Sequence, residues 1–529
     1  MDEPKIHMRK LATLVVIALV LLAGCGGLTG SDTTTAPTGT TPTATPGEEP
    51  TTTPGDEPTA TPTEQPTATP TETPDDGQEA VHPPDPDEDV LGWEEGRWYN
   101  ETIAVDRSNG LNDTELDAVV HRSMARVEVV RQLEFENAVP VEVISREAFK
   151  ANYTGTQNYT LADRLHQNVK WEAMLMVNET TDAIGVQQQN QGATVGGFYS
   201  PSEERIVIVS ENTTSPKMNE ITLSQELFHA LQDQLFNLSS FDYSTQESHN
   251  AADGVVEGDA NLVDQKYEER CTGEWDCLMP QPSNGGGSGS ADIHFGMYLV
   301  TFQPYSDGPP FVQGIYNEGG WEAVNDLYEN PPQSTEQVIH PEKYGEDEPT
   351  VPEIEHSPSN GWHVLDMGND SIDYAVFGEA GLSTMLFYPF YDSGRTQTPV
   401  LGLQDFFNFT ASGQLSSTDP LNYGNEYTSG WDGDKLVPYV KGEPTNDSPR
   451  GYVWKMHWDS ERDATEFLDG YTKLLTYYGG EQVEGDVWKI PDDREFADAF
   501  WIHQDGDTVI IVNAPNQDAL DDVHKGAGS

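Results

Sequence analysis

The class of fold is decided by one segment, which reads Ile221-Thr222-Leu223-Ser224-Gln225-Glu226-Leu227-Phe228-His229-Ala230-Leu231-Gln232-Asp233-Gln234-Leu235. It contains no Gly or Pro, so it predicts a helix over residues 221–235. Leu227, Leu231 and Leu235 recur every four residues and form an apolar face that packs inward. The chemistry of this helix therefore depends on the polar side chains between them.

Two of these polar residues match part of a zinc-binding motif. In H-E-x-x-H, two imidazoles one helical turn apart point at one zinc ion, and the Glu beside the first activates zinc-bound water. Glu226 and His229 are in register with this motif, but Gln225 stands where the first His belongs. Because an amide oxygen is a poor zinc donor, we expect weak zinc binding at most.

A second segment offers a further ligand. Glu257 follows on a predicted second helix, and Asn261 lies one turn later as a hydrogen-bonding support. His249, in a neighbouring loop, is a remote replacement for the missing imidazole. In the alternative interpretation, the helix only presents a solvated face and binds nothing. That face consists of Gln225, Glu226, His229, Gln232 and Asp233.

These motifs resemble a family of secreted zincin-like proteins, whose pattern reads roughly H-E-L-x-H-A-L-Q-D-Q followed by E-G-x-A. The resemblance covers residues 191–440 and includes three further segments: Gly197-Phe198-Tyr199, Gly378-Glu379-Ala380-Gly381-Leu382 and Gly430-Trp431-Asp432-Gly433-Asp434. It implies an α+β fold in which a β-hairpin precedes the active-site-type helix. It also implies that His229 and Glu257 would bind zinc and that Glu226 would act as general base, with Gln225 as the departure from the pattern.

Two aspartate-rich segments resemble calcium-binding turns superficially. They are Trp431-Asp432-Gly433-Asp434 and Asp505-Gly506-Asp507. Neither continues into a twelve-residue loop with a closing Glu, so we expect tight turns in both places.

The charge balance excludes one large class of partners. The 529 residues include 27 Lys and Arg against 90 Asp and Glu, which gives a net charge of −63. Such a field repels phosphate backbones, so no nucleic-acid partner is expected. The acidic residues are spread along the whole chain, and this resembles proteins of salt-loving archaea. Molar salt shortens the Debye length to about 3 Å and would screen the self-repulsion.

The first residues resemble a lipoprotein signal peptide. Lys5, Arg9 and Lys10 precede an apolar run over residues 11–23, and Leu22-Ala23-Gly24-Cys25 resembles a lipobox. We therefore expect a signal peptide over residues 1–24 and a membrane lipid attached to Cys25. The chain is then expected at the extracellular face of the cell membrane, like surface lipoproteins of haloarchaea.

The next segment reads as a disordered tether. Proline recurs every four residues from 42 to 74 among Thr, Ala, Glu and Asp, which favours extended polyproline II. The predicted organisation is a stalk over residues 25–90, a zincin-like domain over 91–365, a helical and loop continuation over 366–448, and a C-terminal α+β subdomain over 449–529.

Covalent modification is expected at cysteines and asparagines. Cys271 and Cys277 are six residues apart and predict one disulfide in an exported protein, although a two-thiolate metal site is the alternative. Ten N-glycosylation sequons agree with a surface glycoprotein. They begin at Asn100, Asn112, Asn152, Asn158, Asn178, Asn212, Asn237, Asn369, Asn408 and Asn446.

Periodicity predicts the remaining elements. Helices are expected over 116–133, 161–174, 373–388, 464–478 and 518–524, strands over 139–144, 452–458, 499–503, 508–512 and near 487, a strand–turn–strand unit over 197–209, a hairpin turn at 504–507 and a flexible loop at 285–290.

Three functional hypotheses follow from these patterns. The first is a lipid-anchored surface protein with a degenerate zincin-like ectodomain that binds a surface protein or glycan without catalysis and needs no cofactor. The second is an active glutamate-type metallopeptidase that uses zinc. The third is an adhesin or cell-wall component whose globular part is only structural.

Overall fold

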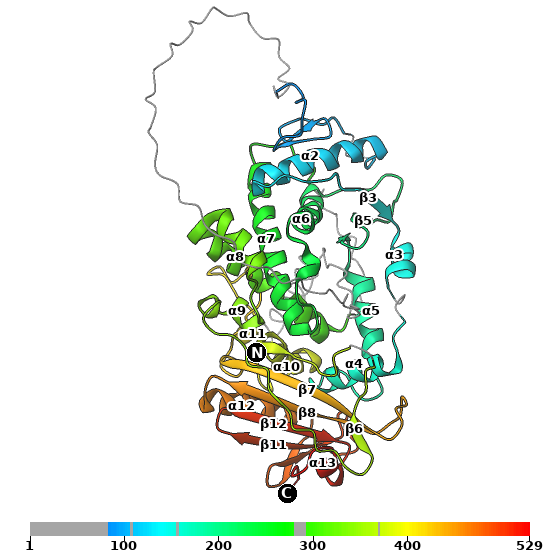
Figure 1. Cartoon of the computed structure of the whole chain (residues 1–529), viewed down its shortest axis with the longest axis vertical. Coiled ribbons are helices and arrows are strands. Elements are labelled where there is room, and N and C mark those ends of the chain that lie inside the picture. Colours follow the sequence, from blue (N-terminus) through cyan, green and yellow to red (C-terminus); the bar gives the residue numbers. More distant parts are fainter. Residues whose placement is uncertain (1–82, 106–108, 155–157, 280–292, 369–370, 529) are drawn as a thin grey trace, which may run out of the picture.

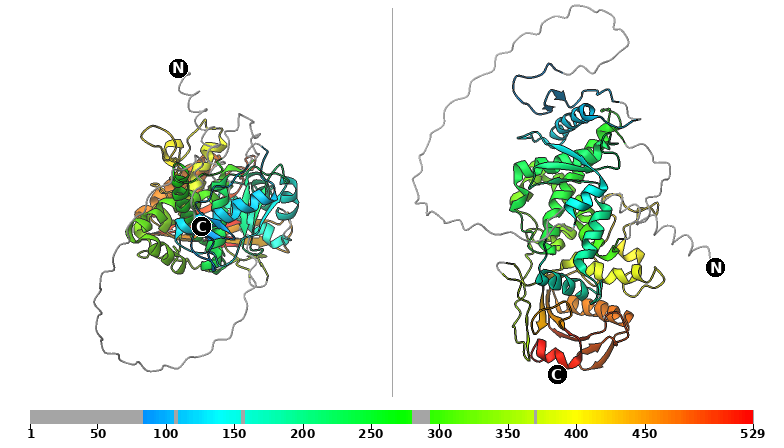
Figure 2. Two further views of the ribbon diagram at one scale, coloured as in Figure 1. Left: turned by 90° about the horizontal axis from the view of Figure 1, so that it is seen from above. Right: turned by 90° about the vertical axis from the view of Figure 1, so that its right-hand side faces the viewer.

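The computed structural model describes residues 83–105, 109–154, 158–279, 293–368 and 371–528. The expected signal peptide, Cys25, most of the stalk, the loop at 285–290 and Asn369 lie outside the described residues. The described chain is mixed α+β, as expected from the sequence. Figures 1 and 2 show a helical part at one end and a large β-sheet at the other.

The helical part is built around α2 (Asp113–Arg131), α6 (Glu220–Phe236), α7 (Gln246–Cys271) and α8 (Phe295–Glu329). Beside α6 lies a three-stranded sheet in which β5 (Arg205–Val209) is central. β3 (Val141–Ile144) pairs with it in parallel, and β4 (Gly197–Ser200) pairs antiparallel. The structure thus confirms the strand–turn–strand unit before the helix at residues 221–235.

Helix α8 was not predicted from the sequence. It contains Pro304, Pro309 and Pro310, which normally end or kink helices. Its packing depends on glycine, because a Cβ on Gly308 would lie 2.5 Å from the Gly254 carbonyl oxygen of α7. The backbones of α7 and α8 therefore approach more closely than larger residues would allow.

The second sheet has seven antiparallel strands. Its order is β6 (Trp362–Val364), β7 (Trp431–Lys441), β8 (Arg450–Trp458), β12 (Thr508–Ala514), β11 (Ala499–Asp505), β10 (Val487–Lys489) and β9 (Glu481–Glu484). Successive residues point to opposite faces of the sheet. Accordingly, Leu436 packs in the core that contains α10 (Gly378–Asp392) and α12 (Glu461–Tyr477), whereas Val437 packs on the side of α13 (Gln517–Val523).

This sheet extends beyond the subdomain predicted over residues 449–529. β7 and β8 are hydrogen-bonded neighbours on either side of residue 449, and β6 adds a strand from near residue 362. The domain boundary predicted at residue 449 therefore lies inside the β7–β8 hairpin. The sequence suggested a boundary there because Pro449 and the polar residues before it resemble a linker.

The segment expected to form a tight turn at residues 431–434 is instead the start of β7, with a bulge between Trp431 and Gly433. Asp434 is buried, and its carboxylate accepts hydrogen bonds from the backbone N–H groups of Phe377 and Gly378 at 3.1 and 2.9 Å. This contact fixes the start of α10, which begins at Gly378 rather than at residue 373. The hairpin turn at 505–507 is confirmed between β11 and β12.

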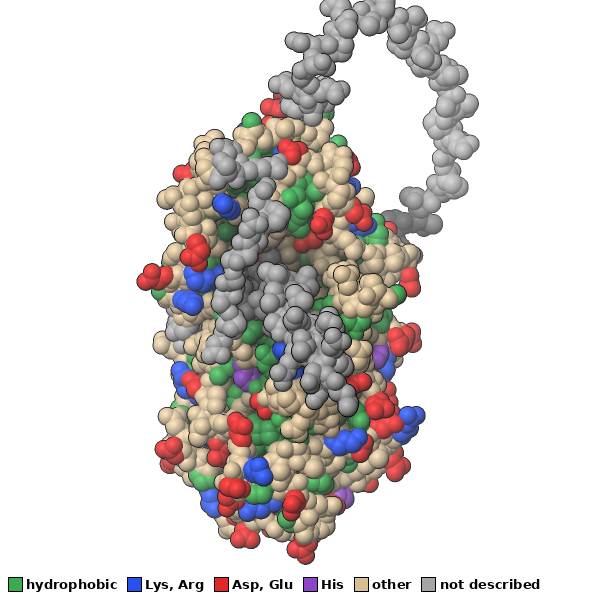
Figure 3. All heavy atoms as spheres, turned by 180° about the vertical axis from the view of Figure 1, so that it is seen from behind, with side chains coloured by type: hydrophobic (Ala, Val, Ile, Leu, Met, Phe, Trp, Pro, Cys, Tyr) green, Lys and Arg blue, Asp and Glu red, His purple; other side chains and the backbone are tan. Residues whose placement is uncertain are grey.

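The remaining described elements connect these parts. They are β1 (Trp93–Glu94), β2 (Arg97–Trp98), α3 (Arg146–Tyr153), α4 (Leu161–Ala173), α5 (Ala183–Thr194), η1 (Leu238–Ser240), α9 (Thr335–Ile339), η2 (Pro341–Lys343) and α11 (Leu403–Phe406). Acidic side chains are scattered over the face seen in Figure 3 and do not gather in one patch.

Candidate functional site

The candidate site lies where α6 packs against α7. Glu226 and His229 on α6 are 2% and 8% exposed, and Glu257 on α7 is 6% exposed. These side chains are therefore buried, and the solvated-face interpretation is wrong for them. Gln225 is only partly buried.

The imidazole of His229 is held in one orientation. Its Nδ1 lies 2.8 Å from Oε1 of Gln232. The Gln232 amide donates from Nε2 to the carbonyl oxygen of Val256 at 2.9 Å, so its Oε1 is the acceptor for His229. The proton of a neutral imidazole is then on Nδ1, and the lone pair on Nε2 faces Glu257 Oε2 at 3.6 Å.

A second layer supports Gln232. Its Nε2 also donates to the Tyr328 hydroxyl at 2.6 Å, and that hydroxyl donates to Asp259 Oδ2 at 2.8 Å. Asp259 forms a fully buried ion pair with Arg131 of α2, with Nη2–Oδ2 at 3.0 Å. A hydrogen-bonded chain thus connects the candidate site to a buried charge pair on another helix. Such supports orient the side chains of a binding site.

Glu257 is a carboxyl group with a high proton affinity. Burial raises its pKa from 4.5 to about 8, and the nearby Asp253 charge adds to this effect. The Tyr305 hydroxyl donates to Oε1 at 2.7 Å and partly opposes the rise. Glu257 is therefore mainly protonated at neutral pH.

Gln225 stands where the H-E-x-x-H motif has its first His, and its side chain lies beside Glu257. Its Nε2 donates a long hydrogen bond of 3.5 Å to Glu257 Oε2. This oxygen is the same atom that faces His229. An N–H donor thus points at the place where a metal would need a lone pair.

Glu226 lies against the edge of the three-stranded sheet. A Cβ placed on Gly197 of β4 would be 4.0 Å from its Oε1. His249 is engaged elsewhere, because its Nε2 lies 3.1 Å from Asp253 Oδ2 on the same helix. It precedes Glu257 by eight residues, or about 12 Å along the axis of α7. The structure therefore gives His249 a partner of its own and does not bring it beside Gln225.

The sequence motifs did not identify Gln232, Tyr305, Tyr328, Asp259 or Arg131 as members of this site. Gln232 follows His229 by three residues on the same helix, so helical spacing could have suggested it. Tyr328 and Arg131 come from distant segments, and no local signal connects them to His229.

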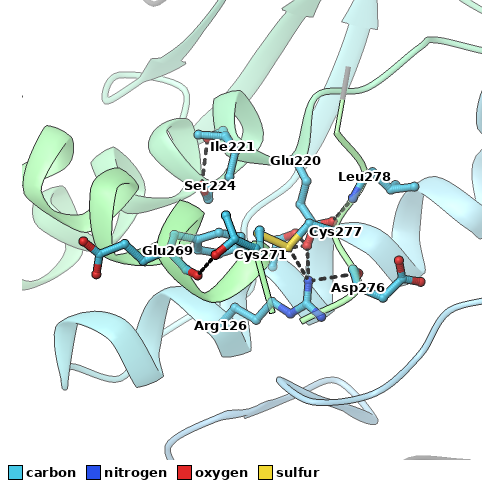
Figure 4. Close-up of a disulfide and its surroundings, with 12 residues drawn as sticks. Arg126, Glu220, Ile221, Ser224, Glu269, Cys271, Asp276, Cys277 and Leu278 are labelled. Carbon is cyan, nitrogen blue, oxygen red and sulfur yellow. Dashed lines mark hydrogen bonds and ion pairs between the residues drawn. A yellow bond between two sulfur atoms is a disulfide. The ribbon is translucent and has the colours of Figure 1, made fainter. Parts of the chain in front are cut away.

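The predicted disulfide is confirmed between Cys271 and Cys277 (Figure 4). It lies beside Glu220, the first residue of α6, which is fully buried. Glu220 binds two guanidinium groups, Arg122 at 2.9 Å and Arg126 at 2.5 Å. The start of α6 is thus fixed by charge pairs.

The predicted glycosylation sites differ in exposure. Asn112, Asn152, Asn158, Asn212, Asn237 and Asn446 are exposed, whereas Asn100, Asn178 and Asn408 are partly buried. The side-chain nitrogens of Asn178 and Asn408 donate to Glu495 and Asp419 at 3.2 and 2.9 Å. A glycan at either position would be attached to the same nitrogen atom that makes this contact.

The fold and site define a mixed α+β protein with a buried His–Glu pair between two helices. A family model described as a domain of unknown function (DUF8575) matches residues 364–524, which run from the end of β6 to the end of α13. No curated protein and no solved structure matches the chain. The matched region contains most of the seven-stranded sheet and does not include the candidate site. Among the described helices, none combines the length and apolar character needed to cross a membrane.

Proposed function

We propose that this protein is a lipid-anchored surface protein whose zincin-like ectodomain binds a surface protein or glycan without catalysis. The observation that carries the proposal is the Gln225 amide, which donates to Glu257 where a metal ligand would be required. The order of elements supports the zincin-like part, because the β4–β5 hairpin precedes α6 and Glu257 follows on α7. The lipobox at Cys25 and the Thr/Pro stalk support the anchoring.

The side chains present do not fit a catalytic zinc centre. Such a centre uses three protein ligands and leaves one position open for water. Here the set consists of one imidazole with a free lone pair, one carboxyl with a pKa near 8 and one amide donor. We therefore derive no hydrolytic step, and Glu226 has no metal-bound water to activate.

Metal analysis of the purified protein in molar salt tests the proposal. We expect substoichiometric zinc in the wild-type chain and no cleavage of a peptide library. Stoichiometric zinc together with peptide cleavage would overturn the proposal. High salt is required because so acidic a chain can unfold in dilute buffer and lose a metal for that reason alone.

One distance favours the alternative of an active glutamate-type metallopeptidase. His229 Nε2 and Glu257 Oε2 are 3.6 Å apart. Two ligands bound tetrahedrally at the usual zinc distances are about 3.3 Å apart. Two of the three ligands therefore lie close to the spacing that zinc requires.

The variant Gln225→His separates these possibilities. If only the third ligand is missing, zinc affinity should rise by about two orders of magnitude or more, because each added ligand contributes to a tetrahedral site. Gln234→His is a matched control on the same helix, where Gln234 accepts backbone hydrogen bonds from Glu136 and Asn137 near the surface. Equal zinc affinities in the two variants would show that His229 and Glu257 are not placed as zinc ligands.

A further inference from the structure

A second group of carboxylates lies far from the His229 site in the sequence. Glu172 is near the end of α4, Glu179 follows that helix, and Asp498 directly precedes β11. One carboxylate oxygen from each residue lies within 4.8 Å of the others. The three side chains bring together α4 and the seven-stranded sheet.

Asp498 is the buried member of this group and has an incomplete set of contacts. It is 6% exposed. Its Oδ2 accepts a hydrogen bond from Asn513 at 3.1 Å, whereas its Oδ1 is buried and has no hydrogen-bond partner among the described residues. A buried carboxylate oxygen without a partner is unfavourable and rare in native proteins. This oxygen therefore has free lone pairs and is available as a ligand atom for a cation.

The charges in the group are only partly balanced. Arg450 lies 3.3 Å from Glu172 Oε2 and is the one cation that bonds to this group in the described chain. When ionised, the three carboxylates carry two negative charges more than one guanidinium balances, and only Asp498 among them is buried. A divalent cation would balance the group.

A similar group elsewhere in the chain shows how such a charge can be balanced without a metal. Glu336, Asp347 and Asp459 also place carboxylate oxygens within 4.8 Å of one another. There, the ammonium group of Lys343 lies 2.7, 3.0 and 2.6 Å from the three carboxylates. The group around Asp498 has no lysine in this position, and Arg450 reaches only Glu172 among its carboxylates.

We propose that Glu172, Glu179 and Asp498 bind a calcium ion that joins α4 to the seven-stranded sheet. Calcium prefers carboxylate oxygens at about 2.3–2.6 Å and accepts irregular geometry. Oxygens on opposite sides of one ion are then about 5 Å apart at most, which accommodates the observed group. Asp498 Oδ1 supplies one of these ligand atoms. Because α4 packs on β7 and β8, the ion holds an existing contact between the two parts of the chain.

Calcium titration of the full chain tests this site. The protein is stripped of ions with a chelator, kept in molar potassium chloride and titrated with calcium chloride in a calorimeter. We expect one saturable site and a rise of the thermal midpoint on calcium addition. Asp498→Asn removes the buried charge without changing the shape of the side chain, and it should lower calcium affinity by about ten-fold or more.

Three further variants make the result decisive. Glu179 is exposed, so Glu179→Gln leaves the fold intact and should also lower calcium affinity, even if Asp498→Asn fails to fold. Two variants serve as controls and should leave the calcium affinity unchanged. They are Asp459→Asn, in the group balanced by Lys343, and Glu257→Gln, in the His229 site. Absence of saturable calcium binding in the wild-type chain, or unchanged affinity in Glu179→Gln, would overturn the proposal.

Discussion

The buried carboxylate of Glu220 should be among the most sensitive positions for stability. Its Oε1 accepts from Arg126 at 2.5 Å and from the Tyr267 hydroxyl at 2.7 Å. Its Oε2 accepts from Arg122 at 2.9 Å and from the Leu278 backbone N–H at 2.7 Å. In Glu220→Gln, an NH₂ group would replace one oxygen and face donors, and two buried guanidinium groups would lose their counter-charge.

Removing one partner of a buried ion pair lowers the free energy of unfolding by about 3–5 kcal/mol. We expect Glu220→Gln to fall in this range, measured by urea unfolding in molar salt with tryptophan fluorescence. Trp275 is one of the eleven tryptophans that contribute to this signal, and the Arg126 guanidinium lies 4.8 Å from its ring centre. The control is Glu466→Gln, which breaks the exposed pair with Arg462 and should change nothing measurable. A loss below about 1 kcal/mol in Glu220→Gln would refute the assigned role of the buried pairs.

Two further predictions concern Glu257 and the disulfide. Because the pKa of Glu257 is raised to about 8, the folded state keeps a proton that the unfolded state releases above pH 4.5, so stability should fall as pH rises from 4.5 to 8. Glu257→Gln does not titrate and should lose this part of the pH dependence of the thermal midpoint, whereas parallel curves would contradict the raised pKa. Removing the Cys271–Cys277 disulfide by a double Ala substitution should lower the free energy of unfolding by about 2 kcal/mol, because the closed loop is short. A urea unfolding curve identical to that of the wild type would show that the bridge has no stabilising role.

Local patterns predicted the elements around the candidate site well. The helix expected over residues 221–235 is α6, Glu220–Phe236, and the hairpin before it is present. These features depend on periodicity and turn chemistry within a few residues, and both can be read from a short window. The disulfide between Cys271 and Cys277 was predictable because the two cysteines are only six residues apart and the chain was expected to be exported.

Contacts between distant segments could not be predicted in this way. The ion pair of Arg131 with Asp259 and the group of Glu172 with Asp498 depend on tertiary packing, for which a single sequence carries no signal. Helix α8 was missed because its prolines and glycines oppose a helix locally, whereas the close approach of Gly308 to Gly254 favours it in the folded chain. The start of α10 was misplaced because the capping carboxylate, Asp434, comes from a distant strand.

The first described residues and the seven-stranded sheet lie at opposite ends of the molecule, and this arrangement affects which surface is accessible to a partner. In Figure 1 the first described residues lie beside α2, and the seven-stranded sheet lies at the opposite end of the molecule. If the proposed anchor holds the chain through the segment before residue 83, the point of attachment lies at the end of the molecule opposite to the seven-stranded sheet. The face formed by residues 431–528 would then be left free of the tether and accessible to a partner.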